Sequence, residues 1–315
     1  MPLLRINATR HGLTLHDTPQ SAGRRLSAMA SQHGPAIIMV HGYKYRPAST
    51  AHCPHRKIFG ADAKSWPAQL DFGTGTQHEG IGIAFGWDAR GTLRKVHNRA
   101  SALGESLAII VAMLRHHTPH RPVRVIAHSL GAEVALSALE YLPNPSIDRM
   151  VLLNGASYTR RAAACLRTPA GLGLELLNVT SRENDVFDAA FERLVPARGA
   201  PDKAIGHGID ALNATTIQLD CGQTLQGFKT MGFDIAPPSR RICHWSTYTR
   251  PGVMALYAQF LRDPIALPFD SLVHMLPRHA APRWSRFLTH RARATSVGDM
   301  PLPPAAHALR SLRRT

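Results

Sequence analysis

The sequence has no apolar run approaching the roughly 20 residues that a membrane-spanning helix needs. Its opening stretch, MPLLRINATRHGLTLHD, becomes polar within a few residues and lacks the apolar segment of a secretory signal. We therefore expect a cytoplasmic protein. Hydrophobic residues make up 44% of the 315 residues, in short runs, which is enough for a sizeable core in one large α/β domain or two smaller ones.

Cysteine is also scarce, and no C-x-x-C pair occurs. The four cysteines lie far apart in the chain: Cys53, Cys165, Cys221 and Cys243. This spacing argues against a disulfide framework and against a zinc site. Among the 18 histidines, His116, His117 and His120 have helical spacing, but no carboxylate or cysteine accompanies them as a further ligand. We expect neither a metal nor a cofactor.

Acidic residues are few relative to basic ones, 21 against 37, which gives a net charge of +16. The segment 278–315 contains eight arginines and one aspartate and accounts for +7 of this charge. The sequence nevertheless lacks the aromatic-interleaved stretches and basic helices of sequence-specific nucleic-acid modules. This charge allows contact with an anionic membrane surface, acidic substrates or nonspecific RNA, and leaves the oligomeric state open.

Short apolar runs that predict buried strands alternate with patterns that predict helices. The expected strands are 36–40, 80–87, a strand starting at 123, 150–153, 174–179 and 242–244, and the expected helices are 62–70, 96–115, one following residue 129, and 251–261. This alternation predicts an α/β fold with a mainly parallel sheet and helices on both faces.

We expect this α/β domain to span residues 36–262. Residues 1–35 form an N-terminal extension, and residues 263–315 form a basic tail rich in proline and arginine. The stretch from about 196 to 238 breaks the alternation of strands and helices. We interpret it as an insertion before the last strand that shapes or covers a pocket.

The segment VRVIAHSLGAEVALSAL, residues 123–139, joins a predicted strand directly to a predicted helix at Ser129. The small residues Ala127 and Gly131 flank the serine, which approximates the G-x-S-x-G nucleophile elbow with alanine in place of the first glycine. The alternative is that Ser129 caps the helix. Because reactive groups collect beyond the carboxyl ends of parallel strands, the position of Ser129 favours a nucleophile.

A nucleophilic serine needs a histidine base and a carboxylate that orients the histidine. In α/β hydrolases these follow the serine in the order acid, then histidine. The preferred acid is Asp185, just past the strand 174–179, with Glu183 and Asp188 as competitors. The preferred base is His244, at the end of the expected strand 242–244 and before the helix 251–261, with His207 as its competitor.

Two backbone amides must also stabilise the oxyanion of a tetrahedral intermediate. One is the amide of Leu130, directly after the serine. The other is the amide of Tyr43, in the loop that follows the strand 36–40. His41 and Gly42 support this loop, and His128 supports the elbow.

Six motifs in this order resemble the serine α/β-hydrolase superfamily: VHGYKYRPAS, AFGWDA, AHSLGAEVAL, NGASY, ENDVFD and CHWSTY. The loop H-G-Y-x-Y-x-P together with AHSLG resembles, more narrowly, a bacterial α/β-hydrolase group of unassigned function. The resemblance covers about residues 37–261. It implies the α/β-hydrolase fold, with Ser129 as nucleophile, Asp185 as acid, His244 as base, and Tyr43 and Leu130 as oxyanion donors.

The expected activity is hydrolysis of a carboxylic ester or thioester through an acyl-enzyme on Ser129, with a lipase- or esterase-like preference for a small-molecule ester or acyl substrate. Acyl transfer would use the same residues. A different class of function is a non-enzymatic protein of this fold that binds anionic lipid or RNA through its basic tail, which starts after Asp263. An amidase or peptidase is chemically permitted, but no motif supports it.

Overall fold

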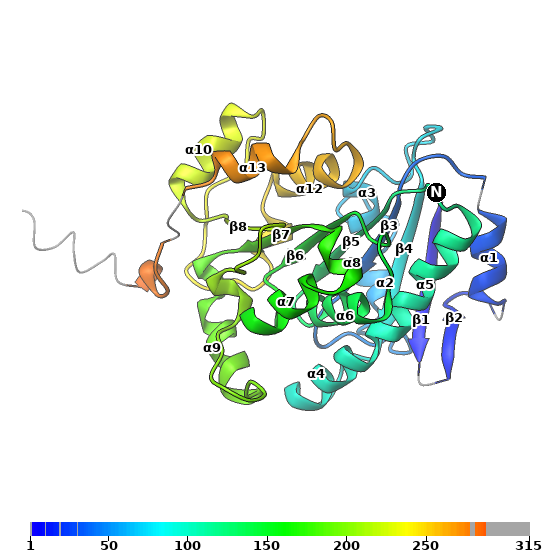
Figure 1. Cartoon of the computed structure of the whole chain (residues 1–315), viewed down its shortest axis with the longest axis horizontal. Helices are drawn as coiled ribbons and strands as arrows, with labels where there is room; N and C mark the ends of the chain where they lie inside the picture. Colours follow the sequence, from blue (N-terminus) through cyan, green and yellow to red (C-terminus); the bar gives the residue numbers. More distant parts are fainter. Residues whose placement is uncertain (1, 10, 19, 30, 278–280, 288–315) are drawn as a thin grey trace, which may run out of the picture.

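A computed structural model describes residues 2–9, 11–18, 20–29, 31–277 and 281–287. Within these residues, eight strands form one sheet in the order β2-β1-β4-β3-β5-β6-β7-β8 (Figure 1). Every neighbouring pair is parallel except β1 and β2. The predicted α/β fold class is therefore confirmed. The strands are β1 Leu3–Thr9, β2 Gly12–Leu15, β3 Ala36–Val40, β4 Ile81–Trp87, β5 Val123–His128, β6 Arg149–Leu153, β7 Glu175–Thr180 and β8 Ala214–Gln218.

Helices cover both faces of the sheet, and each face has its own apolar core. One core contains side chains of α1, α4, α5, α6, α7 and α9, and the other contains side chains of α3, α10, α12 and α13 (Figure 1). The α-helices are α1 Ala22–Ala28, α2 Pro54–Lys57, α3 Trp66–Gln69, α4 Leu93–Ala102, α5 Gly104–His117, α6 Gly131–Ala138, α7 Thr159–Leu166, α8 Pro169–Leu172, α9 Asp185–Leu194, α10 Gly222–Thr230, α11 Ser246–Thr249, α12 Val253–Arg262 and α13 Phe269–Met275. Short 3₁₀ turns are η1 Leu139–Tyr141, η2 Arg182–Asn184 and η3 Ile205–His207.

The central strands are apolar and buried because parallel strands are covered by helices on both sides. Strand β5 pairs with β3 on one side and β6 on the other, so that Ala127 lies opposite both Val40 and Leu152. The chain leaves β5 at Ser129, in the middle of the carboxyl edge of the sheet. The residues after β3 and β6 reach the same edge beside it.

The predicted helix 96–115 is in fact two helices, α4 and α5, separated at Leu103. The break allows α5 to approach α6 closely at Gly104. A Cβ atom on Gly104 would lie 2.5 Å from the Cβ atom of Ser137. The apolar spacing of 96–115 is continuous, so only the packing against α6 explains why the helix divides.

The predicted last strand, 242–244, is wrong: no strand occurs among the described residues of this loop. Ile242 is 46% exposed and has no core to pack against. The edge strand is β8, which lies inside the stretch interpreted as an insertion and pairs with β7 through Val179 and Ile217. Part of residues 196–238 therefore completes the sheet.

Segments outside the expected domain also contribute to the fold. Strand β1 lies in the sheet between β2 and β4, and α13 buries Phe269 and Leu272. The remainder of the basic tail, residues 288–315, lies outside the described residues. No helix in the described part of the chain is both long enough and apolar enough to cross a membrane.

We expect Gly104→Ala to lower the free energy of unfolding by about 1–3 kcal/mol, because the added methyl group overlaps the backbone of α6 at Ser137. Gly222→Ala, at the start of α10, is the matched control, since its Cβ would meet no atom within 4 Å. The control should be neutral or stabilising by less than about 1 kcal/mol. Urea denaturation measures both, and equal losses would contradict the proposed contact.

Candidate active site

Ser129 has a backbone φ of +54°, in the left-handed region that side-chain-bearing residues rarely adopt. Its amide donates a hydrogen bond to the carbonyl oxygen of Leu153 at 3.0 Å, which fixes this turn against the end of β6. Helix α6 begins at Gly131 with Leu130 as its N-cap, so Ser129 does not cap the helix. The conformation is that of a nucleophile elbow, and it persists only because the surrounding packing enforces it.

The loop after β3 lies directly on this elbow. A Cβ atom on Gly42 would be 2.6 Å from the Cβ atom of Ser129, and a Cβ atom on Gly131 would be 2.7 Å from the carbonyl oxygen of His41. Only glycine permits both approaches. The amide of Leu130 follows Ser129 directly and that of Tyr43 follows Gly42, and neither forms a hydrogen bond with any residue that the structure describes. Both predicted oxyanion donors are therefore free to bind a ligand.

His41 anchors this loop to β4. The Trp87 amide donates to its Nε2 at 3.1 Å, and the Trp87 indole donates to its carbonyl oxygen at 3.1 Å. Because Nε2 accepts a hydrogen bond, Nδ1 carries the proton and donates to the carbonyl oxygen of Gly42 at 2.9 Å. Burial lowers the pKa of His41 to about 4, so the ring is neutral and its role is structural.

His244 is held beside the elbow by two side chains that donate to its carbonyl oxygen. These are Asn154 Nδ2 at 2.9 Å and His128 Nε2 at 3.1 Å. The rings of His128 and His244 are 4.6 Å apart between centroids. Burial and the neighbouring His128 hold the pKa of His244 well below 6.5, and burial lowers the pKa of His128 to about 4. Both rings are neutral at physiological pH.

The structure brings Asn184, rather than Asp185, to His244. The distance between His244 Nδ1 and Asn184 Oδ1 is 2.6 Å. Asp185 is fully buried, and its carboxylate accepts hydrogen bonds from Arg182 Nη1 at 3.1 Å and from the Trp284 amide at 2.6 Å. The 3₁₀ turn η2 ends at Asn184, so residue 184 faces the histidine while Asp185 begins α9 and faces the segment 281–287.

Asp188 orients the amide of Asn184. Asn184 Nδ2 donates to Asp188 Oδ1 at 2.9 Å, which places the amide oxygen toward His244. That oxygen can only accept, so His244 Nδ1 carries the proton and Nε2 has a free lone pair. Burial raises the pKa of Asp188 to about 7. Asp188 is one of the predicted competitors for the acid, whereas Asn184 is not a carboxylate and is not among the predicted residues, although an amide oxygen can also orient a histidine.

The other competing residues have different partners. Glu183 is buried in an ion pair with Arg250, and His207 lies against Arg283 and Glu192. In the structure as described, neither contacts His244.

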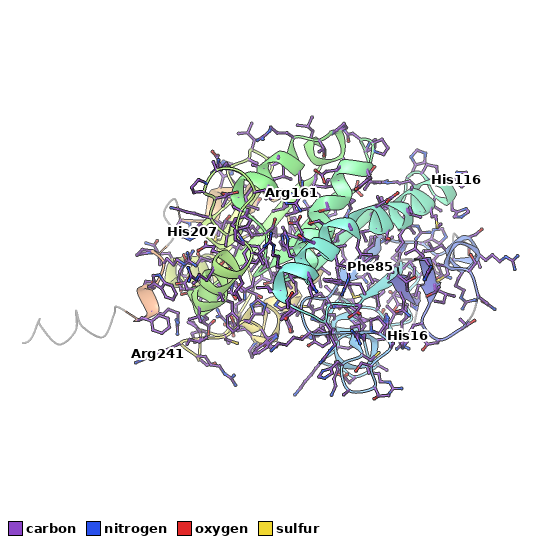
Figure 2. All side chains as sticks on the ribbon, turned by 90° about the horizontal axis from the view of Figure 1, so that it is seen from below. His16, Phe85, His116, Arg161, His207 and Arg241 are labelled. Carbon is purple, nitrogen blue, oxygen red and sulfur yellow. The ribbon has the colours of Figure 1, made fainter. Side chains whose placement is uncertain are left out.

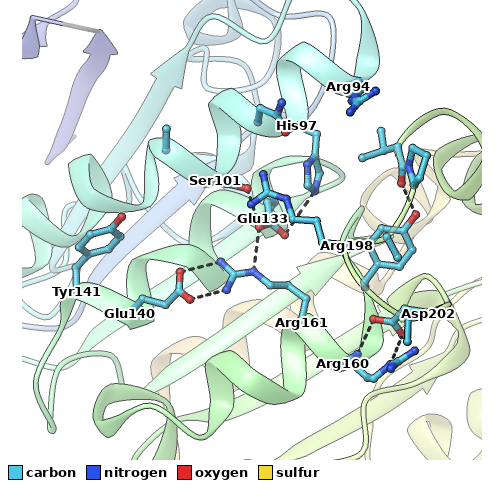
Figure 3. Close-up of a pocket in the computed structure, with 17 residues that line it drawn as sticks. Arg94, His97, Ser101, Glu133, Glu140, Tyr141, Arg160, Arg161, Arg198 and Asp202 are labelled. Atoms are coloured by element: carbon cyan, nitrogen blue, oxygen red, sulfur yellow. Dashed lines mark hydrogen bonds and ion pairs between the residues drawn. The ribbon is translucent and has the colours of Figure 1, made fainter.

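A buried carboxylate anchors α6, the helix that follows Ser129 (Figure 3). Glu133, in the first turn of α6, is 1% exposed and accepts hydrogen bonds from Ser101 at 2.9 Å, Ser137 at 3.2 Å and Ser157 at 2.6 Å. Arg161 Nε lies 3.3 Å from the same carboxylate. Three hydroxyls and a guanidinium satisfy this buried charge and join α4, α6 and α7 around the elbow.

The network lines a cavity of about 680 Å³ between these helices and the 195–202 loop. Helix α9 separates this cavity from the candidate base. Phe191 packs against His97 in the cavity at 5.6 Å between ring centroids, and Phe187, one turn earlier, stacks on His244 at 4.7 Å. Helix α9 thus contacts both His97, which lines the cavity, and His244.

The described part of the chain contains no group of three His, Cys, Asp or Glu side chains placed to hold a metal. The four cysteines are free thiols.

We expect Glu133→Gln to lower the free energy of unfolding by about 2–3 kcal/mol, because the amide cannot replace the charged acceptor of three hydroxyls and Arg161. Glu140→Gln is the control: Glu140 pairs with the same Arg161 at 2.5 Å but is exposed, so its loss should stay within about 1 kcal/mol. Thermal and urea unfolding measure both variants. A larger loss for Glu140→Gln would contradict this assignment.

Residues 19–152 match the family model described as "Alpha/beta hydrolase of unknown function (DUF900)". No curated protein matches the chain at a significant level. Among solved structures, the product of the gene lin2722 from Listeria innocua is similar over 73% of this chain and 94% of that chain, with 13% identity and a TM-score of 0.39. The match over residues 19–152 and the eight-stranded, mainly parallel sheet agree with the α/β-hydrolase fold expected from the motifs: this chain has that fold and is similar, over less than half of its length, to α/β hydrolases of unknown function.

Proposed function

We propose that this protein is a serine hydrolase that cleaves a carboxylic ester or thioester through an acyl-enzyme on Ser129. The observation that carries the proposal is the left-handed backbone of Ser129 at the carboxyl end of β5, with φ of +54°. A strained non-glycine residue at this place has a functional use, because a simple strand-to-helix connection does not require it. The free amides of Tyr43 and Leu130 support the same proposal.

In the proposed reaction, His244 Nε2 removes the proton from Ser129 Oγ while the oxygen attacks the carbonyl carbon of the substrate. The amides of Tyr43 and Leu130 donate to the oxyanion of the tetrahedral intermediate. When the intermediate collapses, the protonated His244 returns its proton to the departing alcohol or thiol. Water, deprotonated by His244, then attacks the acyl-enzyme and releases the acid.

Asn184 holds His244 in the tautomer that this reaction needs, because its amide oxygen accepts from Nδ1. An amide has no net negative charge, so it stabilises the imidazolium less than a carboxylate does. The neutral Asn184 is also the observation that favours a second candidate function, a non-enzymatic binding protein in which the elbow persists without turnover.

We expect a fluorophosphonate probe to label the wild-type protein, and short p-nitrophenyl esters to be hydrolysed, because both reactions need an activated Ser129. Ser129→Ala should abolish both. The control Ser27→Ala, at an exposed position on α1, should retain both. Intact-protein mass spectrometry and release of p-nitrophenol are the measurements. Absence of labelling in folded wild-type protein would overturn the proposal and support the binding protein.

We expect Asn184→Asp to move the acid limb of the kcat/KM profile to higher pH by about one to two units, because a carboxylate beside Nδ1 favours the imidazolium and raises the pKa of His244. In the wild type, the low pKa of His244 keeps the base form down to a pH well below 6.5. The protonated Asp188 can donate a hydrogen bond to the new carboxylate and leave it ionised, since burial raises the pKa of Asp188 to about 7.

The control is Asp185→Asn, which breaks the contact with Arg182 but leaves the surroundings of His244 unchanged. It should reduce stability and leave the acid limb where it is. If Asp185→Asn moved the limb and Asn184→Asp did not, Asp185 would be the partner of His244 in the working enzyme.

A further inference from the structure

Five large apolar side chains are exposed beside the candidate active site, and we call them, with three nearby arginines, the rim patch. The apolar members are Val186, Ile242, Trp245, Trp284 and Phe287, which are 36–46% exposed, and the basic members are Arg240, Arg241 and Arg286. Among the described residues, no tryptophan or phenylalanine outside the patch has comparable exposure. Scattered apolar residues are normal on a protein surface, but a concentration of aromatic residues in one place indicates a binding surface.

Three chain segments form this surface, and specific contacts hold them together. The Trp284 amide donates to Asp185 Oδ2 at 2.6 Å, which fixes the segment 281–287 beside Val186 at the start of α9. Arg286 Nη2 donates to the carbonyl oxygen of Arg240 at 2.8 Å, which fixes it to the 240–245 loop. The segment lies at one end of the molecule, beside α9 (Figure 1).

The rim patch adjoins the site itself. Phe187, which stacks on His244, lies 6.4 Å from the ring of Trp245. Figure 2 shows Arg241 and His207 near the segment 281–287, and His116 at the opposite end of the protein.

The patch is strongly basic. Arg240 and Arg241 are exposed, and neither forms an ion pair with a side chain in the described ranges. Among the described side chains, the ion pair of Arg286 is a long one, with Asp220 at 4.0 Å. The sequence that follows Phe287 contains five more arginines and one aspartate, and the whole chain has a net charge of +16. The ligand of this surface must therefore be anionic and must also accept apolar side chains.

We propose that the rim patch binds the surface of an anionic lipid bilayer. Tryptophan and arginine suit this interface, because the apolar part of each enters the headgroup region while the polar end remains hydrated or contacts a phosphate. Val186 and Ile242 gain from acyl chains but have nothing to bind on an RNA backbone, which favours lipid over RNA. If Ser129 is a nucleophile, as proposed above, a protein bound to the membrane through the rim patch presents its active site to esters in the membrane surface.

The test is co-sedimentation of the full chain with vesicles of phosphatidylcholine, with and without about one third phosphatidylglycerol. We expect binding to the anionic vesicles only. Trp245→Ser with Trp284→Ser should weaken it at least about tenfold, because both anchors are lost. Arg240→Glu with Arg241→Glu should weaken it at least about 25-fold, since each arginine near an anionic surface contributes about a fivefold effect.

Two pairs of control variants separate this surface from general charge and hydrophobicity. Arg24→Glu with Arg25→Glu makes the same change in charge on α1. Leu212→Ser with Ile265→Ser removes two apolar side chains outside the rim patch, which are 105% and 89% exposed. Leu212 precedes the amino end of β8. Each control should retain binding within about threefold, and melting temperatures show that all variants are folded.

Equal losses in the controls and in the patch variants would overturn the proposal, because attraction would then be nonspecific. The proposal would also be overturned if the patch variants weakened binding to single-stranded RNA but left binding to vesicles unchanged. Ser129→Ala should bind vesicles like the wild type. Vesicle binding is therefore tested independently of esterase activity, so failure of the membrane-binding proposal can be distinguished from failure of the hydrolase proposal.

Discussion

The left-handed turn at Ser129 is the constraint on which the rest of the site depends. The left-handed backbone conformation costs about 1–3 kcal/mol of free energy, which neighbouring contacts must offset. The hydrogen bond from its amide to Leu153 and the close approach of Gly42 supply these contacts. Because the turn forces the strand to end and the helix to begin within two residues, it also places the Leu130 amide next to the serine.

Neutral, hydrogen-bonded histidines surround this turn. Burial depresses the pKa of His41, His128 and His244, so none of them carries a charge that would need a buried counter-ion. Each therefore has a defined tautomer wherever its partner can only donate or only accept. The charged groups lie one layer further out, where Glu133 collects three hydroxyls and Arg161, and Asp185 is neutralised by Arg182. The residues that support the turn and those proposed to carry out the chemistry are thus different.

The C-terminal segment links the site to the surface. Its contact with Asp185 lies one residue from Asn184, whose side chain contacts His244, and its aromatic side chains Trp284 and Phe287 are exposed. Asp185, the predicted acid, attaches this segment to α9, and Asn184 rather than Asp185 contacts His244. Asp185 thus serves packing, because the side chain of the neighbouring Asn184 is the one that faces His244.

Local patterns in the sequence were enough to predict the alternation of strands and helices, the serine between β5 and α6 and the loop at Gly42, because periodicity and small residues at close approaches are local properties. The prediction of His244 as the base rests on a last strand that does not form in the described structure. Tertiary structure decided the rest. Strand β8 and the N-terminal strands are defined by their pairing partners. The predicted helix 96–115 divides because Gly104 packs closely against α6. A short 3₁₀ turn orients the side chain of Asn184 toward His244. Which of two adjacent side chains faces the histidine depends on a rotation of the backbone, and that rotation is set by distant segments that no local pattern contains.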